Sequence, residues 1–379
     1  MDFDLEAFSP ALFYLAGVFI ACFSSFLLLG KRKKVMADYL LAVWFLVIGI
    51  HLIFFLFLFS SGYVRFPHFL GLEIPLPLIH GPMLYLYIIC LTNQYSHKKI
   101  WLLHLVPPLI IYVILLDFFL LSPQEKIYVY EHNGSTYKMQ RDSINILIVL
   151  SGILYVTLSI LAIRKYKRLI AELYSNTEKI NLDWGYYLIT SIALIWIAVI
   201  LKYDILIFSL VVLFILLTAY FGINRVGILN VTLIKADGIE GEPEAENNPV
   251  TAKYQKTFVN KDTIQNIYKQ LIYQMEYEKI YKDPELNLHH VAELLEVHPN
   301  ILSQTINSLE NKNFYDYINR HRIEEFKRIA VLPENQKFTL FSLALESGFN
   351  SKTSFNRNFK RYMHCSPREF LKNKNLNAE

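Results

Sequence analysis

The sequence predicts an all-α protein in two parts: a bundle of seven transmembrane helices, then a smaller cytoplasmic domain of two helix-turn-helix units joined by a linker helix. Hydrophobic residues make up 54% of the 379 residues, more than ordinary soluble proteins contain. Long uncharged stretches fill residues 10–223, whereas charged residues alternate densely from about residue 252 to the end. One helical pattern also occurs twice in the last third of the chain. The two parts are therefore expected to face different solvents.

A helix needs about 20 apolar residues to cross the hydrocarbon core of a bilayer, where only intrahelical hydrogen bonds satisfy the backbone. Seven stretches meet this requirement, and only a short polar turn at 202–204 separates the last two. The predicted spans are 10–30, 37–60, 72–92, 101–121, 143–163, 184–201 and 205–223. We assign residues 1–223 to a membrane domain that contacts the lipid bilayer.

Basic residues in the connecting loops predict the orientation of the chain, because Lys and Arg are enriched in cytoplasmic loops. One set of loops holds 11 Lys and Arg residues, including the KRKK run at 31–34, and the opposite set holds five. The N-terminus is therefore predicted outside and the C-terminal domain in the cytoplasm.

The sequence lacks the motifs of common enzymes. It contains no HExxH pair, no GxSxG turn and no Walker-type GxxxxGK, so metal-dependent hydrolysis, acyl transfer and phosphoryl transfer lack their reacting groups. Cys22, Cys90 and Cys365 are odd in number and widely scattered, which disfavours a disulfide framework or a metal site. We predict no enzyme activity, no cofactor and no bound metal.

Polar side chains at membrane depth are costly and are therefore candidate functional sites. His51 lies near the middle of the second predicted span, and His80 precedes Gly81 and Pro82, which would kink the helix and free backbone carbonyl groups. Two interpretations stay open: neutral histidines hydrogen-bonded between helices, or a signal site for an unknown small ligand or a proton. The loop at 122–142 is a lid over such a site or a spacer.

Residues 224–261 differ in composition from both flanking parts. They include Gly238, Gly241 and Pro243, and five acidic residues lie between 237 and 246. Such a segment buries too little apolar area to fold alone. We predict a flexible acidic tether, open to proteolysis, before a domain at 262–379; the sequence does not tell whether cleavage releases that domain.

The last domain opens with an apolar face of helical period after Asp262, a suitable N-cap. A first helix-turn-helix unit is predicted at 286–308, where apolar positions mark a short helix, a turn and a second helix. Ala292 permits close crossing of the two helices, and His298 followed by Pro299 suits the start of the second.

This unit recurs along the chain. Aligning Ala292 with Ala344 also pairs Leu302 with Phe355, once Asn350 is treated as one inserted residue. The second unit is predicted at 338–362, and a helix with an apolar stripe joins the two units at 314–332. The predicted core positions are Ala292, Leu302, Ile306, Ala344, Gly348, Phe349, Phe355 and Phe359.

The second unit carries a specific motif, SLALESGFNSKTSFNRNFKRYMHCSPREF. Through it, residues 262–372 resemble the DNA-binding domain of the AraC/XylS family of bacterial transcription regulators. The matching positions are Ala344, Gly348, Phe349, Ser351, Phe355, Phe359, Lys360, Pro367 and Phe370. Glu296, Asn311 and His364 stand where that family commonly has Gly, which bears on the geometry of the turns.

Seven spans ahead of such a domain resemble the membrane-bound AraC-type regulators of the Bacteroidetes group. The resemblance implies a protein of the bacterial cytoplasmic membrane. The expected partners are double-stranded promoter DNA, RNA polymerase and a second copy of the chain, since linking two domains raises their local concentration. The resemblance points to no known ligand.

The polar faces of the two recognition helices predict how DNA is bound, since Asn, Gln and Arg can read base edges in the major groove. The predicted base-reading residues are Asn300, Gln304, Asn307, Thr353, Asn356 and Arg357. The predicted phosphate contacts are Ser351, Lys352, Lys360, Arg361 and Arg368. Residues 262–336 carry 8 Lys and Arg against 12 Asp and Glu, whereas residues 337–374 carry 8 against 2. We therefore expect the second unit to bind the DNA backbone and the first to select the sequence.

The leading hypothesis is a membrane-bound, sequence-specific DNA-binding transcription regulator that couples a membrane or extracytoplasmic signal to transcription. One alternative is a transporter or channel with a regulatory helical domain, and another is a membrane-tethered scaffold that binds protein. Only one Gly-Pro break interrupts the predicted spans, which disfavours the transporter. The basic second unit disfavours the scaffold.

Overall fold

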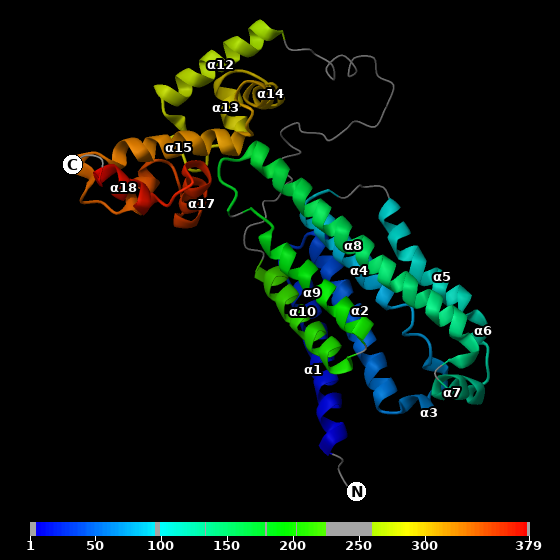
Figure 1. Ribbon diagram of the computed structural model, residues 1–379. Helices are drawn as coiled ribbons and strands as arrows, with labels where there is room; N and C mark the ends of the chain where they lie inside the picture. The colour runs from blue at the N-terminus through cyan, green and yellow to red at the C-terminus, as the bar shows by residue number, and fades with distance from the viewer. Residues whose placement is uncertain are drawn as a thin grey trace. The chain divides into compact units, whose positions relative to one another are not determined.

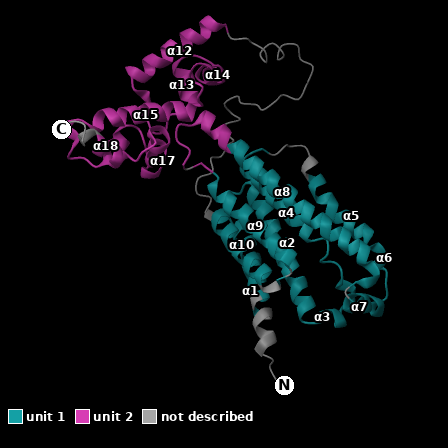
Figure 2. Ribbon diagram, viewed as in Figure 1, with its two compact units in different colours: residues 1–166, 182–231 teal, residues 167–181, 232–379 magenta. Residues whose placement is uncertain are grey.

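The computed structural model describes residues 5–94, 99–132, 134–178, 180–201, 203–224 and 260–376. This part of the chain is helical and contains no β-strand, only an isolated antiparallel bridge between Tyr174 and Asn287. The prediction of an all-α protein is confirmed. The chain forms two compact units, residues 1–166 with 182–231 and residues 167–181 with 232–379 (Figure 1, Figure 2). The predicted tether at 224–261 lies outside the described residues except at its two ends.

The first unit is a bundle of apolar helices (Figure 1). Aromatic pairs join its helices: Tyr14 packs edge-on against Phe208 at 4.1 Å between ring centroids, and Trp44 lies 5.2 Å from Phe214. Its helices are α1 (Leu5–Leu29), α2 (Met36–Phe59), α3 (Gly62–Arg65), α4 (Pro77–Leu91), α5 (Val106–Ile114), α6 (Leu116–Phe119), α7 (Pro123–Glu131), α8 (Lys138–Leu173), α9 (Asp183–Leu201) and α10 (Asp204–Asn224). Residues 167–173 of α8 already belong to the second unit.

Apolar helices coincide with each of the seven predicted spans. Those long and apolar enough to cross a membrane, within the described residues, are Met36–Phe59, Ser135–Leu173, Asp183–Leu201 and Leu206–Ile223. The shorter apolar helices are Tyr14–Leu29, Pro77–Leu91 and Leu102–Ile114. The count of seven and the orientation therefore stay predictions. Among the basic loop residues that predict the orientation, Lys98, Lys179 and Lys202 lie outside the described residues.

The third and fourth predicted spans differ in detail from the helices observed. Helix α4 begins only at Pro77, after a turn that contains Gly71 in the left-handed region at φ 88°. The fourth span consists of a 3-10 helix (Lys99–Leu105), α5 and α6, with Leu115 as the residue between the two α-helices. Hydropathy shows only that these residues are apolar, whereas the prolines and turn geometry set where each helix begins.

One residue of the basic KRKK run has a structural role. The Lys31 ammonium donates to the Asp38 carboxylate at 2.9 Å and to the Gly222 carbonyl oxygen at 2.7 Å. The Asp38 side chain is buried, so its charge is compensated by Lys31. Lys31 thereby joins the α1–α2 turn to the end of α10.

The second unit contains the two repeated units and the helices that pack on them. Helix α12 is capped by Asn260, whose side chain accepts from the Asp262 N–H, so the prediction of Asp262 as the cap is wrong by two residues. The helices are α12 (Lys261–Glu276), α13 (Leu288–Leu294), α14 (Pro299–Glu310), α15 (Phe314–Ala330), α16 (Leu340–Glu346), α17 (Lys352–Met363) and α18 (Pro367–Leu376). One core cluster joins α15, α16 and α17 around Phe326, Phe355 and Phe359.

Besides Lys279, which has φ 50°, three turns of this unit place a residue with a side chain in the left-handed region. Glu296 has φ 53°, Asn311 has φ 52° and His364 has φ 58°. These are the three positions at which the sequence lacks an expected glycine. The backbone keeps the geometry that glycine would favour, at a cost in conformational energy that packing on both sides offsets.

His321 of α15 is expected to make the stability of this unit depend on pH. Burial lowers its pKa to about 4, with Tyr281 and Tyr317 against its ring. The unfolded chain, with a pKa near 6.5, therefore takes up the proton first. The contribution of His321 to the free energy of unfolding should be fully present above pH 6.5. It should be lost as the pH decreases toward 4. Calorimetry of the full chain in detergent should show this loss, and His321→Gln should remove it.

Glu325 on the same helix provides an internal comparison for that measurement. Its hydrogen bond to Arg328 lowers the pKa of the carboxyl to about 2. Its stabilising effect is therefore lost only as the pH falls from about 4.5 toward 2. The slope of the unfolding free energy against pH, between pH 6.5 and 5, should differ between the wild type and His321→Gln. Equal slopes would contradict the assignment to His321.

Candidate nucleic-acid interface

In the first helix-turn-helix unit, side chains cap both helices. Asn287 accepts from the His290 N–H at 2.9 Å at the start of α13. His298 Nδ1 accepts from the Asn300 N–H at 3.2 Å at the start of α14, as the sequence predicted. The inward face of α14 is buried at Leu302, Thr305 and Ile306. The three predicted base-reading residues on its other face, Asn300, Gln304 and Asn307, are exposed.

The second unit repeats this design with α16 and α17. Thr339 caps α16 by accepting from the Ser342 N–H, and Ser351 caps α17 by accepting from the Ser354 N–H at 3.0 Å. The inward face of α17 is buried and holds Ser354, Phe355, Asn358 and Phe359. Its exposed residues are Lys352, Thr353, Asn356, Arg357, Lys360 and Arg361. The predicted core positions of both units, from Ala292 to Phe359, are all buried.

Gly348 shows why the turn of the second unit requires glycine. Its φ is 98°, and a Cβ atom there would lie 2.4 Å from the Tyr281 carbonyl oxygen and 3.0 Å from Arg322 Nε. No side chain fits at that distance. At the equivalent position of the first unit, Glu296 is exposed and also left-handed. The turn of the second unit therefore packs directly against neighbouring backbone, whereas the turn of the first unit has room for a side chain.

The comparison with known proteins gives a match in the region of these two units. Residues 291–373 match a helix-turn-helix domain family. The match supports an AraC-type DNA-binding transcription regulator, and the family is one of DNA-binding regulatory domains, not of enzymes. No curated protein and no solved structure matches the chain. The match begins inside α13 and ends inside α18.

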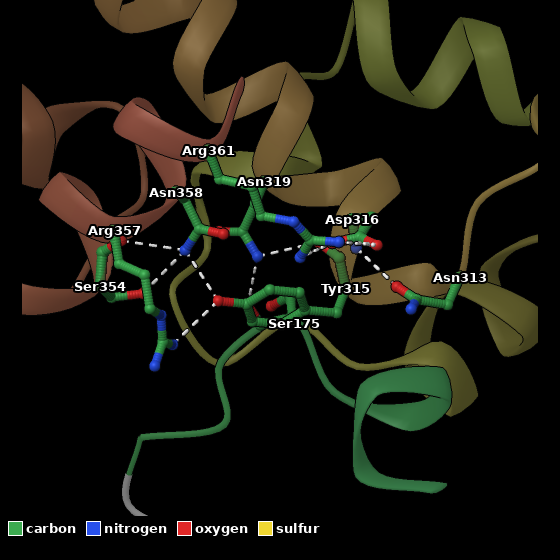
Figure 3. Close-up of polar contacts among 9 residues, drawn as sticks. All are labelled: Ser175, Asn313, Tyr315, Asp316, Asn319, Ser354, Arg357, Asn358 and Arg361. Carbon is green, nitrogen blue, oxygen red and sulfur yellow. Dashed lines mark hydrogen bonds and ion pairs between the residues drawn. The ribbon is translucent and has the colours of Figure 1, made fainter. Parts of the chain in front are cut away.

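In this helix-turn-helix domain, Tyr315 of α15 orients two side chains of the second recognition helix (Figure 3). Its hydroxyl accepts from Asn358 Nδ2 at 2.7 Å and from Arg357 Nη2 at 3.1 Å. Asn358 also donates to the Ser354 carbonyl oxygen. Arg357 is thus held by a buried tyrosine while the residue stays exposed. A preorganised guanidinium loses less conformational freedom when it binds.

Arg361, a predicted phosphate contact, lies in an ion pair. Its two Nη atoms donate to the two carboxylate oxygens of Asp316 at 2.8 and 3.1 Å (Figure 3). A phosphate would have to compete with this carboxylate for the same edge of the guanidinium. Among the other predicted phosphate contacts, Lys352, Lys360 and Arg368 are exposed and Ser351 is half-buried.

The pattern of the sequence did not single out several residues that hold this domain together. Arg322 is 2% exposed and donates to the carbonyl oxygens of Tyr281 at 2.7 Å and Asp283 at 2.7 Å. Its remaining bonds go to Asn319 and Ser175. Arg322 itself was the available signal, since it is a charged residue on the apolar face of the helix predicted at 314–332. A guanidinium buried there requires several acceptors.

His51 and His80 come together in the first unit. Trp44 Nε1 donates to His80 Nδ1 at 3.2 Å, and His80 Nε2 lies 3.0 Å from His51 Nδ1. Since His80 Nδ1 accepts, a neutral His80 carries its hydrogen on Nε2 and donates it to His51. This arrangement matches the interpretation of neutral histidines hydrogen-bonded between helices.

The same histidines line a cavity of about 910 Å³ within the first unit. Its walls are largely apolar, and its polar lining includes Glu73 and Asn145. Glu73 Oε2 is buried without a hydrogen-bond partner in the described part of the chain. Val129 and Tyr130 of α7 also line the cavity, so the segment predicted as a lid or a spacer forms part of its wall. In the residues that the structure describes, no cluster of metal-ligating side chains occurs.

Proposed function

We propose that the chain is a membrane-bound, sequence-specific DNA-binding transcription regulator that couples a membrane or extracytoplasmic signal to transcription. The N-terminus would lie outside the bacterial cytoplasmic membrane and the helix-turn-helix domain inside. Double-stranded promoter DNA, RNA polymerase and a second copy of the chain are the proposed partners.

One observation carries this proposal: two equivalent helices, α14 and α17, each bury an apolar face and expose a row of polar side chains. We assign base reading to Asn300, Gln304 and Asn307 on α14, and to Thr353, Asn356 and Arg357 on α17. Amide and guanidinium groups can form paired hydrogen bonds to adenine and guanine. Such pairing would give the protein its sequence preference.

Charge supports a division of labour between the two units. The exposed Lys352 and Lys360 flank the base-reading row of α17, and Ser351 lies at the N-terminus of that helix. Basic side chains and a helix N-terminus both attract phosphate. We propose that the second unit supplies most contacts to the DNA backbone and that the first unit supplies selectivity.

The salt dependence of binding tests this proposal. For the full chain in detergent micelles, Lys360→Ala should flatten the slope of log affinity against log salt by about 0.9, because one phosphate contact is lost. Affinity for every duplex should fall by a similar factor. Fluorescence anisotropy with a random duplex and with a duplex enriched from a random pool measures both effects.

Lys269→Ala is the matched control, since Lys269 is an exposed lysine of α12 and lies away from the recognition helices in sequence. It should leave the salt slope unchanged. Equal slopes for both variants would refute the assignment of Lys360 to phosphate binding. Absence of wild-type binding to any duplex at low salt would refute the proposed function itself.

We propose the cavity around His51 and His80 as the place where the signal acts. Its size suits a small molecule, its walls suit an apolar one, and Glu73 Oε2 is an acceptor without a partner among the described residues. A transporter would instead move a substrate through this unit. Substrate uptake by vesicles that contain the protein separates the two functions.

A further inference from the structure

Residues 174–178, here called the docking segment, form part of the second unit although they follow α8 in the chain (Figure 2). Tyr174 forms an antiparallel bridge with Asn287. The Ser175 N–H donates to the Leu286 carbonyl oxygen at 3.2 Å, and the Ser175 hydroxyl donates to the same oxygen. The segment thereby pairs with the residues that precede α13, the first helix of the repeated units.

Ser175 is 1% exposed and fills a polar site built by α15. Its carbonyl oxygen accepts from Asn319 Nδ2 at 3.0 Å (Figure 3). The same oxygen accepts from Arg322 Nη1 at 3.2 Å. Its hydroxyl oxygen accepts from Arg322 Nη2 at 2.9 Å. Without Ser175, the buried guanidinium would lose two of its acceptors. This end of the segment is therefore held firmly by the domain.

The other end of the docking segment lies at the second recognition helix. The Ser351 hydroxyl donates to the Glu178 carboxylate, while the same hydroxyl oxygen caps α17 through the Ser354 N–H. Both Glu178 and Ser351 are only half-buried, so this contact can open more easily than the contact at Ser175. The carboxylate thus lies where the N-terminal end of α17 presents its positive partial charge.

A carboxylate and a DNA phosphate can occupy the same position at the N-terminus of α17. Both are anions that accept hydrogen bonds, and both are favoured at a helix N-terminus. Ser351 and Lys352, at this end of α17, are among the residues assigned above to backbone phosphates. One hydroxyl hydrogen cannot serve Glu178 and a phosphate together, and two adjacent anions would repel each other.

We infer that Glu178 of the docking segment competes with a DNA phosphate for the N-terminus of α17 and thereby lowers the affinity of the domain for DNA. The inference rests on the proposed function. Ser175 keeps the segment beside the domain, which gives Glu178 a high effective concentration at Ser351. Because α8 leads directly into this segment, a movement of that helix would reach the DNA-binding surface without passing through residues 224–261.

The test compares Glu178→Ala with the wild type as full chains in detergent micelles. Removal of the competing carboxylate should tighten binding to an enriched duplex by about 10-fold, the lower end of the range for a charge-assisted contact, because this contact is half-buried. Glu178→Gln, which keeps the shape and loses the charge, should give a smaller gain. Anisotropy at one fixed salt concentration measures all three affinities.

Glu172→Ala is the matched control, because Glu172 is an exposed acid of the last turn of α8. It removes the same charge close by in sequence without touching Ser351, so it should change affinity less than 2-fold, the range expected of a screened surface charge. An equal gain in Glu178→Ala and Glu172→Ala, or no gain in either, overturns the inference while the wild type still binds. If the wild type and all variants bind no duplex, the proposed function falls and this inference with it.

Discussion

Replacing Arg322 by methionine is expected to lower the free energy of unfolding of the helix-turn-helix domain by about 3 kcal/mol, the largest effect of any single change considered. Burial lowers the pKa of this guanidinium to about 10, so it is charged at neutral pH. It is bound by carbonyl, amide and hydroxyl oxygens instead of a carboxylate. Methionine would remove the donor to the Tyr281 carbonyl oxygen and to Asn319 Oδ1, and the Asp283 carbonyl oxygen would keep only its bond from the Leu286 N–H.

A single thiol can report this loss of stability. Cys365 is packed against the core cluster of α15, α16 and α17, and burial slows the labelling of a thiol. In a background with Cys22→Ser and Cys90→Ser, the urea concentration at which Cys365 becomes reactive measures unfolding of the domain. Arg322→Met should shift it to much lower urea.

Arg320→Met serves as the control on the same helix. Arg320 is 42% exposed and pairs with Glu310 at 3.2 Å, and an exposed ion pair contributes about 1 kcal/mol at most. Its variant should shift the urea midpoint little. Equal shifts for the two variants would show that the buried hydrogen bonds of Arg322 do not hold the domain together.

Arg357→Ala is expected to have the largest effect on sequence preference. A guanidinium that reads a guanine contributes about 1 to 3 kcal/mol of discrimination, equivalent to about 5-fold to 150-fold between the preferred base and others. The preference at one base pair should disappear while other positions persist. Sequencing of duplexes enriched from a random pool by each variant measures this change directly.

Tyr315→Phe separates orientation from contact in this experiment. It removes the hydroxyl that accepts from Arg357 and Asn358 and keeps the ring. A partial loss of preference at the same base pair is expected, because Arg357 would then be less preorganised. If Arg357→Ala weakens binding to every sequence alike, Arg357 contacts phosphate and its assignment as a base reader is wrong.

Much of the fold followed from local patterns. The all-α class, the apolar helices and the helix start at Pro299 depend on hydrophobic periodicity and on capping side chains a few residues away. The same periodicity predicted that Leu302 and Phe359 face the core. Prediction failed where chain geometry decided, as at the start of α4 and in the division of the fourth span.

The candidate interface was only partly predictable. The polar rows of α14 and α17 were predictable from the sequence, because residues three or four apart lie on the same face of a helix. The pairing of Arg361 with Asp316 and the support of Arg357 by Tyr315 were not. Each of these pairs is 42 or 45 residues apart along the chain, and nothing in the local sequence encodes their meeting.

By itself the sequence determined that this is a helical protein with an apolar first part and a repeated DNA-binding unit in its second part, since burial and capping act over one or two turns. Only the tertiary structure decided that Ser175 and Glu178 belong to the second unit. Ser175 reaches Arg322 across 147 residues and Glu178 reaches Ser351 across 173. Such contacts depend on which residues the folded chain brings together, because buried polar groups form hydrogen bonds with whatever partners lie nearby.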